Sequence, residues 1–219
     1  MEVLPGHLQR VPSGHDPGQV AALSRSPRER ILEAATELFA KRGYGGTTIE
    51  HIVKRAGVAR ATFYESFENR EECLFACVDE GFGAAKAEIA EATAGAADWP
   101  SGVAAGLAAL VGFAVAEPAV VRTCLIECQT AGPRGMDHYD AALQEFLPLL
   151  SPGRQLAADG DELPQTLEES LVGGVVWMIR KRLLRGEVES VPSLLPTMVE
   201  FCLAPYLGDE RAAQLAASS

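Results

Sequence analysis

Hydrophobic positions recur at helical spacing along most of the chain, and the breaks between them fall at glycine and proline. The first clear pattern follows Ser26. Its "SPRE" start predicts a capping box with proline at the first helical position, and the apolar face then runs through Ile31, Ala35, Leu38 and Phe39. Basic residues and Gly43 follow, as is typical of a helix end.

A second apolar face, at positions 49, 52, 53 and 56, follows "TTIE" and ends at Gly57. We expect Thr47 to cap this helix, with Glu50 reaching back. The pattern resumes almost at once with Phe63 and Phe67, which predicts a short helix crossing the previous one steeply. Asn69 then caps a longer helix that ends near Gly95.

The rest of the chain predicts further helices separated by proline and glycine, near 101–116, 119–130, 136–150, 164–185 and 193–207. Strand alternation is not evident. We therefore predict an all-α fold of about nine helices, with an N-terminal three-helix helix-turn-helix domain and a C-terminal helical bundle. The expected division is a disordered leader at 1–25, a helix-turn-helix domain at 26–71 with its helix-turn-helix at about 48–67, and a helical bundle at 72–219.

The composition is that of a globular protein, because 47% of the 219 residues are hydrophobic. The apolar run 171–179 is only nine residues long, far below the roughly 20 of a membrane span, so we expect no membrane partner. Five cysteines, an odd number, lie within helical patterns. We expect reduced thiols and a cytoplasmic protein.

The formal net charge of -11 is unevenly distributed. Residues 26–70 hold eight Lys/Arg against six Glu, whereas residues 71–219 hold nine Lys/Arg against 22 Asp/Glu. A phosphate backbone can therefore approach the slightly basic N-terminal unit although the chain as a whole is acidic.

Two short helices joined at a glycine are typical of a helix-turn-helix, whose second helix enters the major groove of DNA. Apolar residues including Phe63 and Phe67 face the core, which leaves Arg60, Thr62 and Tyr64 exposed. Arginine pairs with guanine and hydroxyls hold phosphates. The same shape also occurs in all-helical proteins without a nucleic-acid partner, so shape alone leaves both interpretations open.

The segment "RERILEAATELFAKRGYGGTTIEHIVKRAGVARATFYESFENREECLF" resembles the DNA-binding domain of TetR-family transcriptional regulators. The resemblance covers about 48 residues and includes the Thr-Thr pair, the Ala-Gly-Val turn and the Thr-Phe-Tyr-x-x-Phe helix. It implies operator contacts at Thr47, Thr48, Arg60, Ala61, Thr62, Tyr64, Ser66 and Arg70. Three positions depart from the family pattern: Ala59 replaces a usual serine cap, Ala61 a common glycine and Ser66 a common histidine or other bulky polar residue.

The resemblance also implies that 26–71 is a DNA-binding domain and 72–219 a ligand-binding and dimerisation domain. The homodimer would be built from the helices at 164–185 and 193–207. Their apolar surface is large, and Gly173 and Gly174 allow close approach, so both helices fit a four-helix interface. Burial within one chain is the alternative. The expected interface residues are Leu167, Leu171, Val175, Met178, Leu195, Met198, Val199 and Cys202.

A small-molecule effector site inside the C-terminal bundle is the third implication. We expect a hydrophobic or amphipathic effector bounded by aromatic and apolar walls with a few polar contacts. The candidate residues, each of which can equally be ordinary core, are Phe113, Arg122, Glu127, Gln129, His138, Tyr139, Phe146, Trp177 and Met178.

Two cysteine pairs at helical spacing, Cys73/Cys77 and Cys124/Cys128, raise the question of a metal site or redox switch. Packing of small hydrophobic side chains explains them equally well, and we predict no metal and no cofactor. We also predict no enzyme activity, because the chain lacks a nucleophile-base-acid set and a phosphate loop.

These inferences lead to one expected function, a sequence-specific, ligand-responsive transcriptional regulator of pseudo-palindromic double-stranded operator DNA, expected to be a repressor. Two alternatives remain open. One is a small-molecule-binding helical bundle that has lost specific DNA recognition; the other is a thiol- or metal-responsive regulator.

Overall fold

The structure, a computed structural model, describes residues 25–218. The predicted leader at 1–25 lies outside the described residues except for Arg25. The described part is all-helical, as predicted, with ten α-helices: α2 (Pro27–Arg42), α3 (Ile49–Ala56), α4 (Arg60–Ser66), α5 (Arg70–Thr93), α6 (Trp99–Ala116), α7 (Pro118–Arg122), α8 (Pro133–Gln144), α9 (Leu167–Arg185), α10 (Leu195–Leu207) and α11 (Asp209–Ala216).

The N-terminal helices begin at side-chain caps. Ser26 and Glu29 form the predicted capping box of α2. The cap of α3 is Thr48 rather than Thr47: the Thr48 hydroxyl accepts from the His51 amide, and His51 Nδ1 accepts from the Thr48 amide, both at 3.2 Å. The predicted capping box of Thr47 and Glu50 was therefore wrong by one residue.

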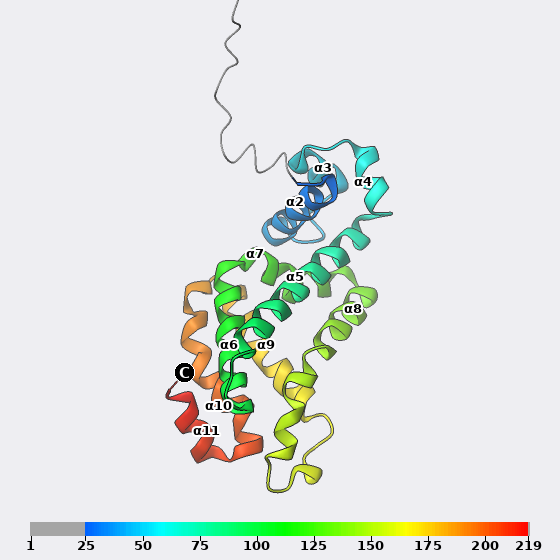
Figure 1. Cartoon of the computed structure of the whole chain (residues 1–219). Coiled ribbons are helices and arrows are strands. Elements are labelled where there is room, and N and C mark those ends of the chain that lie inside the picture. Colours follow the sequence, from blue (N-terminus) through cyan, green and yellow to red (C-terminus); the bar gives the residue numbers. More distant parts are fainter. Residues whose placement is uncertain (1–24, 219) are drawn as a thin grey trace, which may run out of the picture.

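Helix α5 joins the two ends of the molecule (Figure 1). It begins at the predicted cap, where the Asn69 side chain accepts from the Glu72 amide. Its first turns pack against α2, and the rest of its 24 residues run beside α6 in the C-terminal bundle. Helix α5 is about 36 Å long and therefore belongs to both parts of the chain.

Helix α6 corrects the expectation that no segment approaches the length of a membrane span. Its 18 residues have a mean hydropathy of 1.6, so this helix is long and apolar enough to cross a membrane by length and composition. One such helix is weak evidence, because core helices pass the same test. In the fold, α6 packs against α5, α10 and α11.

The segment predicted as one helix at 119–130 changes its winding twice. Helix α7 continues into a π-helical turn, η1 (Thr123–Glu127), and then a 3-10 turn, η2 (Cys128–Ala131). Such π-turns are rare and often lie at functional sites. Four further 3-10 turns are present: η3 (Leu147–Leu149), η4 (Ser151–Gln155), η5 (Gly160–Glu162) and η6 (Val188–Leu194). Helix α11, at the far end of the bundle, was not predicted (Figure 1).

Candidate nucleic-acid interface and ligand cavity

Helices α3 and α4 form the helix-turn-helix. The turn between them is possible because Gly57 adopts a left-handed conformation, with φ of 64°. Helix α4 has no side-chain cap, since Ala59 occupies the cap position. Phe63 is fully buried and its ring centroid lies 5.6 Å from that of Phe67, so these two residues fix α4 to the domain as predicted.

Arg30 contributes to this unit in a way that the sequence pattern did not indicate. From α2, its Nε donates to the carbonyl of Ala56 at 3.2 Å and its guanidinium to that of Gly57 at 2.7 Å. Carbonyls at the end of α3 lack partners within the helix, so a cation there completes their hydrogen bonding. Arg30 therefore holds the turn that orients α4.

Arg60 and Tyr64 lie one helical turn apart on the exposed side of α4. The Arg60 guanidinium donates to the Tyr64 hydroxyl at 3.2 Å and lies 5.7 Å from the centre of its ring. Ala61 is also exposed, while Thr62 and Ser66 are half-buried beside this face. The arrangement places one cation, one phenol and a methyl group on a single surface, as recognition of base edges requires.

Two predicted phosphate contacts are engaged inside the domain instead. Thr47 is fully buried, and its hydroxyl donates to the carbonyls of Leu38 and Gly43. Arg70 donates to the Thr47 carbonyl and stacks 4.1 Å from the centre of the Tyr44 ring. Both residues position the start of α3 relative to α5. The expected direct contact of Thr47 is corrected because its side chain is fully buried, whereas the contact expected of the half-buried Arg70 stays a prediction.

A cavity of about 430 Å³ lies in the C-terminal bundle. Its walls come from α5, the α5–α6 turn, α6, α9, the α7–η1 segment, the η3–η4 loop and one residue each of α8 and α10. The lining is almost entirely apolar, and its volume is in the range of small-molecule sites. An apolar ligand is therefore the class that this space accommodates.

Two of the predicted pocket residues, Phe113 and Phe146, line this cavity. Polar side chains predicted for the pocket have other partners: Gln129 donates to the Leu125 carbonyl, and His138 contacts Asp79 at 2.7 Å and stacks on Phe75. The following predicted residues lie outside the lining: Arg122, Glu127, Gln129, His138, Tyr139, Trp177 and Met178.

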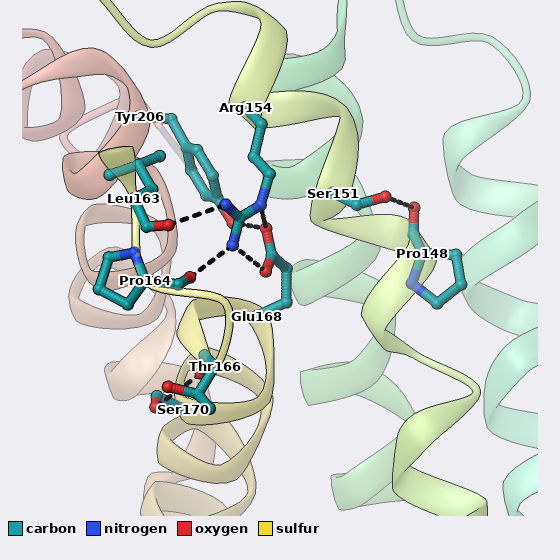
Figure 2. Close-up of polar contacts among 9 residues, drawn as sticks. All are labelled: Pro148, Ser151, Arg154, Leu163, Pro164, Thr166, Glu168, Ser170 and Tyr206. Atoms are coloured by element: carbon teal, nitrogen blue, oxygen red, sulfur yellow. Dashed lines mark hydrogen bonds and ion pairs between the residues drawn. The ribbon is translucent and has the colours of Figure 1, made fainter. Parts of the chain in front are cut away.

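The loop that forms one wall of the cavity is held by a partly buried ion pair (Figure 2). Arg154 donates to both carboxylate oxygens of Glu168 at 2.7 Å and to the carbonyls of Leu163 and Pro164. The Tyr206 hydroxyl donates to the same carboxylate at 3.0 Å. These hydrogen bonds, led by that of Arg154, hold the pKa of Glu168 below its usual value although burial opposes this.

The turn η1 connects the cavity to the DNA-binding domain. Cys124 and Leu125 of this turn line the cavity. Glu127, which is buried, accepts from the Tyr44 amide at 2.9 Å, and the Thr123 hydroxyl donates to the Thr36 carbonyl at 3.3 Å. Glu127 was predicted as a ligand contact; the structure makes it a link between the domains.

All five cysteines are buried. Burial raises the pKa of Cys128 and of Cys202 to about 12, so these thiols stay protonated and pack as small hydrophobic groups. Within residues 25–218 no three His, Cys, Asp or Glu side chains are grouped so that they could hold a metal ion. The thiol- or metal-responsive alternative therefore gains no support.

The predicted dimer residues lie mostly on the wrong side of their helices. Leu171, Val175, Met198, Val199 and Cys202 are buried inside the chain, which leaves them no surface for a partner. The apolar side chains that are exposed on the same helices are Trp177 at 56%, Leu184 at 52% and Phe201 at 39%. The alternative of burial within one chain is correct for those five residues.

Comparison with known proteins shows which family the N-terminal domain matches. Residues 31–77 match the model of bacterial regulatory proteins, tetR family. The fatty acid metabolism regulator protein of Bacillus subtilis is 39% identical over 54 residues, covering 25% of this chain and 28% of that protein. The matches span only 19% to 30% of the first curated relatives' own length, so this likeness is confined to one domain.

Solved structures extend the likeness in fold to the C-terminal bundle. FadR from Bacillus subtilis, in complex with stearoyl-CoA, has a TM-score of 0.69 at 17% identity, covering 82% of this chain and 98% of that one. AibR, in complex with isovaleryl coenzyme A and operator DNA, has a TM-score of 0.58 at 20% identity, covering 76% and 99%. The chain therefore has an N-terminal domain that matches the tetR family of bacterial regulatory proteins over residues 31–77, followed by a helical bundle that shares its fold with these two solved structures.

Proposed function

We propose that this chain is a homodimeric transcriptional regulator that binds a pseudo-palindromic operator and is released from it by a small hydrophobic or amphipathic effector. The observation that carries the proposal is the exposed face of α4, where Arg60 and Tyr64 project from a helix fixed by Phe63. The domain boundary near residue 71 and a cytoplasmic location are parts of the same proposal.

The proposed DNA contacts are those that remain exposed or half-buried on the helix-turn-helix: Thr48, Arg60, Ala61, Thr62, Tyr64 and Ser66. Arg60 would read a guanine in the major groove, and the start of α3 at Thr48 would lie against phosphate. Since these contacts displace counterions, the affinity for DNA should fall steeply with salt.

The effector would occupy the cavity beside η1. A regulator solved with stearoyl-CoA and another with isovaleryl coenzyme A share this fold, which supports a ligand site in the C-terminal bundle. Any ligand that releases DNA must bind one arrangement of the two domains better than the other, and the operator affinity falls by the same factor.

The proposed dimer interface uses the exposed side of α9 and α10. Gly174 brings the helices together, because an added Cβ would lie 2.6 Å from the Phe201 ring. Trp177 is one turn further along α9, so Trp177 and Phe201 form a neighbouring apolar surface. A two-fold partner would cover this surface and set the spacing of the two α4 helices to about 34–36 Å.

Selection of genomic DNA fragments by the purified protein tests this function. The expected result is enrichment of one pseudo-palindromic sequence by the wild-type protein and a relaxed or weakened preference for Arg60→Ala. Glu65→Gln, which changes an exposed residue of the same helix without removing a proposed contact, serves as the control. Recovery of fragments with no common sequence would contradict the proposal.

A further inference from the structure

The residues that line the cavity extend along α5 from a buried end to an exposed end. Along α5 the cavity wall runs from Gly81 to Thr93, about 18 Å, which is about twice the diameter of a sphere of 430 Å³. The buried end lies near Gly81 and Cys124. The exposed end lies between the α5–α6 turn and the η3–η4 loop, where Asp98, Pro148 and Leu149 are exposed.

The charge of the lining is confined to the exposed end. Asp98 is the only charged residue among those that line the cavity in the described part of the chain. Its carboxylate accepts from the Ser101 amide at 2.9 Å, and hydrogen bonds from Ser101 lower the pKa of Asp98. Asp98 is therefore an anion at neutral pH and retains acceptor capacity for a ligand.

The cations on neighbouring elements lie outside the lining. Lys86 is paired with Glu145 at the surface, and Arg154 is bound to Glu168 (Figure 2). Arg211 acts on Asp98 from α11 but lies outside the lining. The N-terminus of α6 would favour an anion, yet Asp98 already caps it.

Trp99 strengthens the preference of this end for a cation. It lines the cavity directly after Asp98, and its Nε1 donates to the Leu149 carbonyl at 3.0 Å, which fixes the ring in the wall. An indole ring attracts a nearby ammonium group through its π-electrons. The Asp98 carboxylate and the Trp99 indole, which also packs against Tyr206, would together favour a positive or neutral head group over a negative one at this end.

We propose that the cavity takes a single-chain amphiphile whose apolar chain lies along α5 and α6 and whose uncharged or, preferably, positively charged head group lies at Asp98 and Trp99. This inference deepens the proposed function and rests on it. It also separates this chain from the structural relatives solved with acyl-coenzyme A ligands, whose head groups carry phosphates.

Calorimetry on the purified full-length chain tests the head-group preference directly. The probes are dodecylamine, dodecanol, dodecanoate and dodecanoyl coenzyme A, each used below its micelle-forming concentration. We expect the amine to bind about 5- to 30-fold more tightly than dodecanoate, because the exposed carboxylate of Asp98 attracts the ammonium group and repels the carboxylate group. Dodecanol should bind with an intermediate affinity. Dodecanoate or dodecanoyl coenzyme A binding as tightly as the amine would overturn the proposal.

Asp98→Asn isolates the charge, because asparagine caps a helix as well as aspartate does. The amine should bind about 2- to 5-fold more weakly to this variant and dodecanoate more tightly. Asp140→Asn, which neutralises an exposed carboxylate on α8 outside the lining, should leave both affinities unchanged. Equal effects of the two substitutions would show that Asp98 plays no specific part.

Substitutions that fill the cavity test whether the apolar chain of the ligand lies inside it. Ala85→Phe fills the middle of the α5 wall, and Leu107→Phe fills the α6 wall at a less buried position should the first variant fold poorly, which circular dichroism reports. Either folded variant should abolish amine binding, and retained binding would contradict the proposed site. These titrations contain no DNA. A wrong order of probe affinities would therefore overturn the head-group proposal without affecting the proposed operator binding, and a failed selection of genomic DNA would overturn operator binding without affecting the order of probe affinities.

Discussion

Glu127 accepts a hydrogen bond from the backbone amide of Tyr44 at 2.9 Å, joining the C-terminal bundle to the DNA-binding domain. The same π-helical turn places Cys124 and Leu125 against the cavity. A ligand that displaces this wall therefore acts on residues two or three positions from an interdomain hydrogen bond. This turn therefore links the two proposed sites through a hydrogen bond, in addition to the covalent connection along α5.

Glu127→Ala should destabilise the protein by about 1–3 kcal/mol, because the substitution leaves a part-buried amide without its acceptor. Glu127→Gln retains an acceptor oxygen and should cost less. Denaturant unfolding of both variants measures the difference. If the stability of Glu127→Ala equals that of the wild type, the hydrogen bond does not hold the domains together.

Substitutions of Arg60 and Phe63 should affect different properties, the first operator affinity and the second stability. Arg60→Ala should bind the selected operator about 5- to 150-fold more weakly with an unchanged unfolding transition. Phe63→Ala should lose about 3–5 kcal/mol of stability, since Phe63 is fully buried. Operator titrations and thermal unfolding check the pair, and a destabilised Arg60→Ala variant would refute the division of roles.

The ion pair of Glu168 with Arg154 should make stability depend on acid pH. Because the folded-state pKa of Glu168 is lowered from its ordinary value of about 4.5, its contribution is complete above pH 4.5 and is lost as the pH falls through the folded-state pKa. Glu168→Gln should therefore cost about 1–3 kcal/mol at pH 7 and progressively less below pH 4.5. A difference between wild type and variant that does not change with pH would count against the ion pair.

Trp177→Asp should shift the protein from dimer to monomer, because it places a charge on the apolar surface proposed for the interface. Met136→Asp is the matched control: Met136 is similarly exposed, but it lies on α8 rather than on α9 or α10. Analytical ultracentrifugation distinguishes the two species. Monomers in both variants, or in neither, would exclude Trp177 as an interface residue.

Local signals predicted the N-terminal domain well. Ser26, Gly57 and Asn69 mark helix ends through hydrogen bonds and backbone conformations that involve only a few neighbouring residues. Such local interactions can be predicted from the sequence. The cap at Thr48 was missed by one residue because Thr47, an equally good cap, is drawn inward by the carbonyls of Leu38 and Gly43. That choice depends on packing between helices.

The predictions for the C-terminal bundle failed at residues whose environment depends on tertiary packing. The most apolar stripes of α9 and α10 were assigned to a dimer, yet Leu171 and Met198 are core residues, while Trp177 lies on the exposed side. Helical spacing identifies an apolar stripe but cannot tell which neighbour covers it. In the same way, Phe113 and Phe146 were identified as cavity residues, whereas the role of Asp98 depends on the fold of two distant loops.

Reciprocal linkage between the cavity and the operator tests the central claim most directly. The operator affinity is measured with and without a saturating ligand that calorimetry places in the cavity, and the ligand affinity with and without operator. The account predicts that both affinities fall by the same factor, about 5-fold or more. An operator affinity that is unchanged by a ligand shown to occupy the cavity would contradict ligand-controlled DNA binding.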